Sequence, residues 1–434
     1  MQTDQRADVV VIGAGLAGLA VAGYAARAGR SVVLLEKAGA AGGRAQTTAV
    51  GRFQFNLGPH ALYRNGHAEQ VLRELDVPIA GRSPNASGGY AVSGGVAHAL
   101  PGGFLSLLTT GLFGIASKLE AARLLAGLGR MAAAPLDRTS VRDWLARDVR
   151  QPEVRALLGG LVRVSSYAAD HARMSAGAAV AQVQGALGGG VRYLDGGWQP
   201  LVDGLAATAT RAGARLSTSA RAAAVTDGGG CRTVRLADGT TIDADAVVIA
   251  AGPDAAAQLL DGAAGATARG WASAAIPVRA ACLDIGMSRL PRPRATFALG
   301  IDRPLYLSVH SAVARLAPEG AAMIHVMKYG AGDADPRAEE REIEGLLDLI
   351  QPGWRELTIE RRFLPNMLVS HALPTAAAGG LSGRPQVAVP GADGVYVVGD
   401  WVGPTGMLAD ASMASAHQAA QAIAARPLPA RAAA

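Results

Sequence analysis

The N-terminal segment constrains the fold of this chain more than any other part. An apolar run that begins at Asp8 leads into the turn Gly13-Ala-Gly15-Leu-Ala-Gly18, and a second apolar run ends in Glu36. This order predicts a buried strand, a glycine-rich turn that opens a helix, and a second strand that ends in an acid. Such a βαβ unit is typical of dinucleotide-binding proteins.

Each residue of this pattern has a physical role in binding a dinucleotide. Gly13 permits a tight turn, Gly15 lets the backbone approach a pyrophosphate, and Gly18 lets the helix pack closely on the sheet. The start of the helix offers unpaired N–H groups and the positive end of its dipole to the phosphates. Glu36 follows Gly15 by twenty-one residues, which places its carboxylate to accept hydrogen bonds from a ribose diol.

The segment after Glu36 indicates which dinucleotide the chain binds. It reads Gly39-Ala-Ala-Gly42-Gly43-Arg44, and a plain NAD-binding domain needs no second glycine pair or arginine there. The extension resembles that of the glutathione-reductase-like flavoproteins, in the family of phytoene desaturases, protoporphyrinogen oxidases and monoamine oxidases. The order of motifs is most similar to the phytoene-desaturase group. The resemblance implies FAD, held in part by the backbone amides of Gly42 and Gly43 and the guanidinium of Arg44.

A second signal lies near the C-terminus, where an apolar strand ends in Gly399-Asp400 and a helix is predicted about seven residues later. The resemblance implies that Asp400 accepts a hydrogen bond from a ribityl hydroxyl. Met407 and Leu408 would lie at the start of that helix, beside the flavin pyrimidine. The positive end of a helix dipole there favours the negative charge of a reduced flavin.

The family resemblance also implies flavin contacts from the segment Gly58-Pro59-His60 and from residues of the middle of the chain. Histidine suits proton transfer near neutral pH, so His60 is a candidate catalytic residue; the alternative is that it only binds backbone or cofactor. The other seven histidines lack ligand spacing and are expected to be surface or packed residues. The further cofactor contacts implied in the middle of the chain are Val225, Ala251 and Gly252.

Arg279 is the second candidate catalytic residue. It lies on a predicted strand about 120 residues before Asp400. In the monoamine-oxidase branch a lysine at a comparable place holds a water against flavin N5, so the arginine departs from that pattern. An arginine inside a strand is otherwise usually solvent-facing. Lys328, on another predicted strand, is the alternative candidate.

The fold class that the resemblance implies is α/β: a glutathione-reductase-like FAD-binding Rossmann domain with an interleaved α+β substrate domain. Residues 232–252 predict a hairpin with an Asp238-Gly239 turn; in the family the strand that follows joins the nucleotide-binding sheet, and the hairpin lies outside it. The predicted segments are FAD-binding parts at 1–63, 191–259 and 389–425, substrate-domain parts at 64–190 and 260–388, and a flexible tail at 426–434.

Composition excludes several other functions. The net charge is +6, but only three of the 41 basic residues are Lys and no basic run is interleaved with aromatics, so we exclude nucleic-acid binding. Cys231 and Cys282 are distant in sequence and lie near no histidine cluster, which argues against a disulfide framework and a metal site. The polar N-terminus predicts no signal peptide, and a reducing cytoplasm is the expected compartment.

Residues 101–117 carry no charge, but they are too short and too glycine-rich for a transmembrane helix, which needs about 20 apolar residues. We expect a buried helix-turn-helix of the substrate domain. A substrate-channel mouth or a monotopic membrane patch is the less favoured alternative.

The predicted function is that of a FAD-dependent oxidoreductase, desaturase- or dehydrogenase-like, that moves a hydride from an apolar small molecule to flavin N5. Oxygen or a quinone is the expected electron acceptor. A flavin amine oxidase is one alternative, although the C-terminal segment offers only Trp401 toward an aromatic cage and aromatics make up 4% of the chain. A flavin-dependent isomerase without net redox is another.

Overall fold

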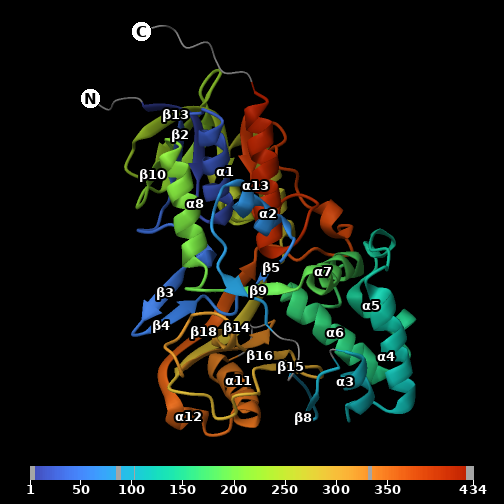
Figure 1. Cartoon of the computed structure of the whole chain (residues 1–434). Helices are drawn as coiled ribbons and strands as arrows, with labels where there is room; N and C mark the ends of the chain where they lie inside the picture. The colour runs from blue at the N-terminus through green and yellow to red at the C-terminus, as the bar shows by residue number, and fades with distance from the viewer. Residues whose placement is uncertain (1–4, 85–88, 102, 331–334, 427–434) are drawn as a thin grey trace.

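The computed structural model describes residues 5–84, 89–101, 103–330 and 335–426. Figure 1 shows two sheet-containing parts, one above the other, with a group of helices beside the lower one. The predicted tail at 426–434 lies outside the described residues except for Arg426. Within the described ranges no helix is both long enough and apolar enough to cross a membrane.

The upper sheet has seven strands that come from three separate stretches of the chain. Strands β10, β2, β1, β13 and β19 run parallel, and β12 and β11 continue the sheet in antiparallel fashion. The strands are β1 (Gln5–Ile12), β2 (Val32–Leu35), β10 (Arg215–Ser217), β11 (Ala222–Asp227), β12 (Arg232–Leu236), β13 (Thr241–Ile249) and β19 (Val395–Val397).

Helices cover both faces of this sheet, which explains why its central strands are apolar throughout rather than alternating. Val9 and Val11 of β1 pack toward α1, α8, α13 and α2, whereas Val10 and Ile12 pack toward α9 and α10. The helices are α1 (Leu16–Arg27), α2 (His67–Glu74), α8 (Gln199–Arg211), α9 (Pro253–Leu259), α10 (Gly262–Ala274) and α13 (Leu408–Ala424).

The predicted Asp238-Gly239 hairpin is confirmed, with the Leu236 N–H donating to the Thr240 carbonyl at 2.8 Å. Its expected place outside the nucleotide-binding sheet is wrong. β13 is nine residues long, so its first half can pair with β12 while the strand also pairs with β1, and its last three residues pair with β19. The hairpin is therefore part of the same sheet, and β11 forms the edge beyond β12.

The lower sheet also has seven strands, in the order β18-β14-β17-β16-β15-β7-β8. Helix α11 covers one face of it, and the other face looks toward the upper part of the molecule (Figure 1). The elements are β7 (Tyr90–Ser93), β8 (Val96–Ala99), β14 (Val278–Met287), β15 (Phe297–Gly300), β16 (Leu305–Val309), β17 (Ala322–Tyr329), β18 (Thr358–Ser370), α11 (Pro336–Ile350) and α12 (Trp354–Leu357).

Helices and two small sheets complete the fold and connect its parts. The helical group holds α3 (Phe104–Thr109), α4 (Ile115–Leu128), α5 (Val141–Asp148), α6 (Pro152–Ser166) and α7 (Ala176–Gly189). One small sheet pairs β3 (Thr47–Val50) with β4 (Phe53–Asn56), and the other joins β5 (Leu62–Tyr63), β9 (Val191–Leu194) and β6 (Gly81–Arg82).

The uncharged run at 101–117 forms the predicted helix-turn-helix as α3 and the start of α4. The expectation that it is buried is wrong. Leu105 and Ile115 are 76% and 81% exposed, because these helices contact the rest of the protein on one side only. The boundaries of the FAD-binding and substrate segments remain a proposal.

Candidate FAD site and substrate face

The glycine turn after β1 is shaped by close contacts within the protein at two of its three glycines. Gly13 has φ +104°, and a Cβ on it would lie 2.5 Å from the carbonyl oxygen of Ala250 at the end of β13. A Cβ on Gly18 would lie 1.9 Å from the carbonyl oxygen of Gly13. Both positions exclude any side chain, so the tight turn and the close helix packing follow from the fold itself.

Gly15 differs from these two glycines. It is the N-cap residue of α1 with φ −75°, and a Cβ built on it would meet no heavy atom within 4 Å. The protein therefore gives no steric reason for glycine there. A group outside the chain that approaches the amides at the start of α1 does give one, as a pyrophosphate would.

Glu36 closes this turn from the end of β2. It is 8% exposed, and its two carboxylate oxygens accept from the backbone N–H groups of Ala14 and Ala38, each at 2.8 Å. A carboxylate has about four acceptor positions, so the side chain keeps capacity for a ribose diol.

The second glycine pair lies directly against the first turn. The Gly42 N–H donates to the Ala14 carbonyl at 2.7 Å, and Gly15 and Gly42 form an isolated bridge. Gly42 and Gly43 both have positive φ, +118° and +54°, a region that favours glycine. The structure thus brings the two glycine motifs together at the start of α1.

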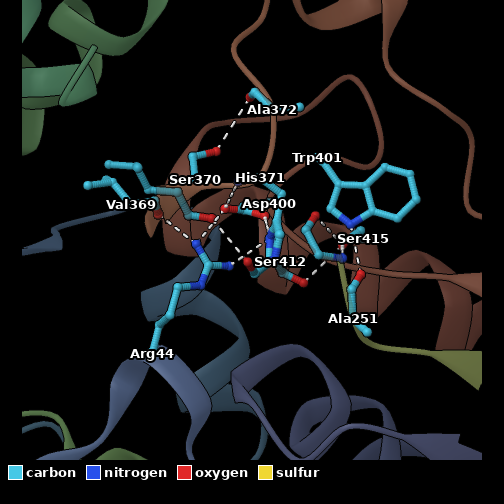
Figure 2. Close-up of polar contacts among 12 residues, drawn as sticks. Arg44, Ala251, Val369, Ser370, His371, Ala372, Asp400, Trp401, Ser412 and Ser415 are labelled. Carbon is cyan, nitrogen blue, oxygen red and sulfur yellow. Dashed lines mark hydrogen bonds and ion pairs between the residues drawn. The ribbon is translucent and has the colours of Figure 1, made fainter. Parts of the chain in front are cut away.

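Arg44 joins the N-terminal motifs to the C-terminal one, as Figure 2 shows. Its Nη1 donates to Oδ2 of Asp400 at 2.8 Å and to the carbonyl of Val369 at 2.6 Å. His371 completes the group: its Nδ1 lies 2.8 Å from Oδ1 of Asp400, and its backbone N–H donates to Oδ2 at 3.2 Å. Two other chain segments, those of Arg44 and His371, therefore converge on the Asp400 carboxylate.

The Asp400 carboxylate is 1% exposed. Burial by itself raises its pKa, but the Arg44 guanidinium and the hydrogen bonds from His371 outweigh burial and hold the pKa well below its usual range. Asp400 is therefore a buried anion. The sequence predicts only a surface or packed position for His371, because no motif surrounds it and only the fold brings the end of β18 to Asp400.

The C-terminal segment beyond Asp400 forms the predicted strand-turn-helix. Gly399 is held to α13 by Ser415, whose Oγ accepts from the Gly399 N–H at 3.0 Å. Met407 is the N-cap of α13, and Leu408, its first residue, has φ +56°, a strained conformation for a leucine. Trp401 is 2% exposed, and its Nε1 donates to the Ala251 carbonyl at 2.9 Å (Figure 2), so it packs into the core of the upper sheet.

His60 lies between the two loops that the resemblance places near the flavin. Its Nδ1 is 3.0 Å from the Gly58 carbonyl and its Nε2 is 3.0 Å from the Arg44 carbonyl. Burial lowers the pKa of His60, so the ring is neutral near pH 7 and can donate to only one of these two acceptors. This arrangement favours positioning of the loops over proton transfer to a substrate.

The structure does not bring Arg279 or Lys328 to this site. Ala281 and Leu283 of β14 pack against α11, and Arg279 lies on the same face of the strand because side chains alternate. Its Nη1 donates to Asn366 at 3.2 Å. Lys328 forms an ion pair with Glu342 of α11 at 2.8 Å, so it too faces α11.

Of the remaining residues predicted to contact the cofactor, some lie at the site and others lie away from it. Gly252 lies at the site, since a Cβ on it would lie 2.4 Å from the His371 ring, and the Ala251 carbonyl is held by Trp401. Val225 is 4% exposed on β11 and packs in the core on the α9 side of the sheet. Pro59 accepts from the hydroxyl of Tyr167 at 3.1 Å.

A group of tyrosines lies on the inner face of the lower sheet, against the Gly58-Pro59 turn. The ring centroids of Tyr167 and Tyr329 are 6.3 Å apart, and those of Tyr306 and Tyr329 are 6.4 Å apart. Burial raises the pKa of all three phenols, so they are neutral. The Tyr329 hydroxyl has no partner among the described residues. We call these three residues the tyrosine cluster; sequence reasoning missed it because they come from distant segments.

A buried ionic network lies beside this cluster. Asp284 is fully buried; its Oδ1 lies 2.6 Å from His325 Nδ1, and its Oδ2 accepts from Arg362 Nη2 at 2.6 Å. Burial raises the pKa of Asp284, but His325 and Arg362 outweigh burial and lower it. Cys282, Asp284 and His325 place ligand atoms within 4.8 Å of one another, yet the Arg362 guanidinium already binds the carboxylate. The group is built as an ion-pair network rather than as a cation site.

The comparison with protein families decides the assignment. The model described as "Flavin containing amine oxidoreductase" matches residues 16–424. The chain belongs to this family. This flavin amine oxidoreductase family member is thus a FAD-dependent oxidoreductase, and the open space at Gly15, the free acceptor capacity of Glu36 and the Arg44–Asp400 pair fit the cofactor.

Solved structures agree on the fold. An oxidoreductase from Methanosarcina mazei is 19% identical, with a TM-score of 0.76 over 96% of this chain and 100% of its own. Cyclohexylamine oxidase from Brevibacterium oxydans IH-35A is 18% identical, with a TM-score of 0.72 over 96% and 98%. Wild-type putrescine oxidase bound to putrescine is 15% identical, with a TM-score of 0.74 over 98% and 100%.

Proposed function

We propose that this oxidoreductase removes a hydride from a carbon atom of an apolar small molecule, in the manner of a desaturase or dehydrogenase. The tyrosine cluster carries this proposal. It presents aromatic rings next to the Gly58-Pro59 turn, and Ala280, Met327 and Met367 surround it with apolar side chains. Tyr306 and Tyr329 are 4% and 1% exposed, so the cluster is a buried apolar region, which suits an apolar carbon skeleton through burial of apolar area.

The charges near this face support an apolar substrate. Asp284 is the buried carboxylate beside the tyrosine cluster, and it is already paired with Arg362 and His325. It therefore offers little free charge to a substrate. Among the described residues the Tyr329 hydroxyl has no hydrogen-bond partner, so it can bind a polar group of the substrate, such as a hydroxyl, carbonyl or amine.

When bound, FAD would supply the two-electron acceptor, and we expect oxygen or a quinone to be the final electron acceptor. The chain's own contribution is binding and orientation. The start of α13 places the positive end of its helix dipole at the C-terminal segment, and we infer that the tyrosine cluster excludes water from the reacting carbon. The site residues offer few groups for proton transfer, since His60 is neutral and both of its ring nitrogens lie 3.0 Å from backbone carbonyl oxygens.

Amine oxidation is the second candidate function. The faces of aromatic rings attract amines and ammonium groups, and the tyrosine cluster supplies such faces although the C-terminal segment does not. Two of the structural neighbours are amine oxidases by name. In that case a carbon next to nitrogen would lose the hydride.

The first experiment is the visible spectrum of the purified protein before and after denaturation, with the released compound identified. FAD released without covalent attachment is the expected result. The protein is then mixed without oxygen with apolar alkenes and alcohols, and separately with cyclic and aliphatic amines. Bleaching of the flavin by the first class alone supports the proposal, and bleaching by amines alone supports the second candidate. A flavin that only dithionite bleaches, while substrate is still isomerised, would contradict both.

A further inference from the structure

A buried arginine lies beside the loop that joins Asp400 to α13. Arg384 is 7% exposed, and its Nη1 donates to the Gly406 carbonyl at 2.8 Å. Its Nε is buried and has no partner among the described residues. In the part of the chain that the structure describes, no carboxylate forms an ion pair with it. A cation buried in this way costs stability unless another group compensates its charge.

The backbone next to Arg384 fixes its place relative to α13. The Pro385 carbonyl accepts from the Gly403 N–H at 2.8 Å, so the two segments run side by side. Gly406, which the Arg384 guanidinium binds, directly precedes Met407, the N-cap residue of α13. The guanidinium therefore lies at the start of α13, where the helix dipole already supplies positive charge.

The charges at this place do not balance within the chain itself. Among the described residues, Asp400 is the one charged group that acts on the pKa of Arg384, and Arg44 already binds Asp400 at 2.8 Å. Burial lowers the pKa of Arg384 to about 10, so the side chain is still a cation near pH 7. Arg44 and Asp400 cancel each other, and the charge of Arg384 remains. An anion from outside the chain would compensate it.

We propose that Arg384 stabilises the negative charge of the reduced flavin and thereby raises the reduction potential of bound FAD. The family resemblance implies that the start of α13 lies beside the flavin pyrimidine. Hydride transfer breaks a C–H bond of the substrate and forms an N–H bond at flavin N5, so the flavin gains two electrons and one proton. The negative charge that results lies on the pyrimidine, where a buried cation stabilises it. The inference rests on bound FAD and not on the proposed substrate.

A purely structural role for Arg384 makes a different prediction. In that case its hydrogen bond to Gly406 fixes the loop, and its charge has no effect on the flavin. Arg384→Lys keeps the cation but loses the planar guanidinium, whereas Arg384→Met keeps only the stem of the side chain. A structural role predicts that both substitutions change the potential alike, and a role for the charge predicts that only Arg384→Met lowers it.

The test is a redox titration of the FAD-loaded protein with dithionite against a reference dye, followed by flavin absorbance, so that no substrate is needed. Arg384→Met is expected to lower the equilibrium constant for two-electron reduction by about tenfold or more, since a unit charge about 10 Å away has that effect at the effective dielectric of a protein. Tenfold corresponds to a fall of about 30 mV in the reduction potential. Arg384→Lys is expected to stay close to the wild type.

The matched control is Arg30→Met, which removes a cation from the opposite end of the same helix. Arg30 Nη2 donates to the Ile423 carbonyl in the last turn of α13 at 3.2 Å, and the 17 residues of the helix span about 25 Å. The control is expected to keep the wild-type potential. The proposal fails if Arg384→Met keeps that potential too, if Arg384→Lys falls as far as Arg384→Met, or if the control falls equally.

The pH dependence of the wild-type potential is a second measurement, which does not require any variant to fold. A reduced flavin that stays anionic takes up one proton with its two electrons, so the equilibrium constant for reduction changes about tenfold per pH unit. This dependence is expected at pH values where unbound reduced flavin is neutral. A change of about a hundredfold per pH unit there indicates two protons and would overturn the proposal, because the reduced flavin would carry no negative charge.

Discussion

A substitution in the Arg44–Asp400–His371 group can separate the role of Asp400 in stability from its role in binding the cofactor. The change is Asp400→Asn, which keeps the shape of the side chain but removes its charge. The carboxylate is 1% exposed and accepts three hydrogen bonds, from Arg44 Nη1, His371 Nδ1 and the His371 backbone N–H. An amide of the same shape cannot accept all three.

The expected loss of stability depends on how well Arg44 and His371 are hydrated once they no longer bind the Asp400 carboxylate. Breaking a fully buried ion pair costs about 3–5 kcal/mol. Here the side chains of Arg44 and His371 are 37% and 25% exposed, so both can be partly rehydrated. We therefore expect the free energy of unfolding of the FAD-free protein to fall by about 2–3 kcal/mol.

Urea unfolding of the FAD-free protein, followed by tryptophan fluorescence, measures this loss as a lower midpoint at unchanged slope. The matched control is Asp393→Asn, because Asp393 also binds an arginine through both oxygens, at 2.8 and 2.9 Å, but its side chain is 84% exposed. The control is expected to change stability by less than about 0.5 kcal/mol. Equal effects of the two substitutions would refute the reasoning.

The same pair of proteins makes a pH prediction. The pKa of Asp400 is lowered in the folded protein, so its contribution to stability is complete above the unfolded pKa of about 4 and is lost as the pH falls below that value. The stability difference between wild type and Asp400→Asn should therefore shrink below about pH 4, by up to about 1.4 kcal/mol per pH unit. A difference that stays constant from pH 6 to pH 3 would contradict the assigned ion pair.

The remaining predictions concern the glycine turn and the tyrosine cluster. Gly18→Ala should lower stability by more than about 3 kcal/mol, because its Cβ would lie 1.9 Å from the Gly13 carbonyl oxygen; folded yield and urea unfolding measure it. Gly15→Val should keep the FAD-free protein within about 1 kcal/mol of wild type yet abolish FAD retention, so a yellow variant would contradict the pyrophosphate assignment. Tyr329→Phe removes a hydroxyl without a described partner; it should leave stability unchanged or raise it by about 1 kcal/mol while raising KM, and an unchanged KM would remove Tyr329 from substrate binding.

The sequence by itself predicted the dinucleotide-binding turn, and its resemblance to known flavoproteins predicted FAD, which the family match confirms. Local rules suffice there, since the turn from β1 to α1 and the acid that ends β2 follow one another within forty residues. The spacing of Gly13, Gly15 and Gly18 already predicts where the turn needs close approaches, and the structure gives the distances at Gly13 and Gly18. The Gly399-Asp400 motif was found in the same way, as the end of a buried strand before a helix.

Only the tertiary structure decided which distant residues complete the site. His371 reaches Asp400 because β18 ends beside the C-terminal strand, and nothing near it in sequence marks that encounter. The sequence suggested Arg279 as a catalytic residue, but the structure places it on the α11 side of β14. Successive side chains of a strand point to opposite faces, and the sequence does not indicate which face meets the cofactor. The tyrosine cluster and the exposure of the uncharged helices likewise depend on how separate segments pack, which is set by long-range contacts that no local pattern encodes.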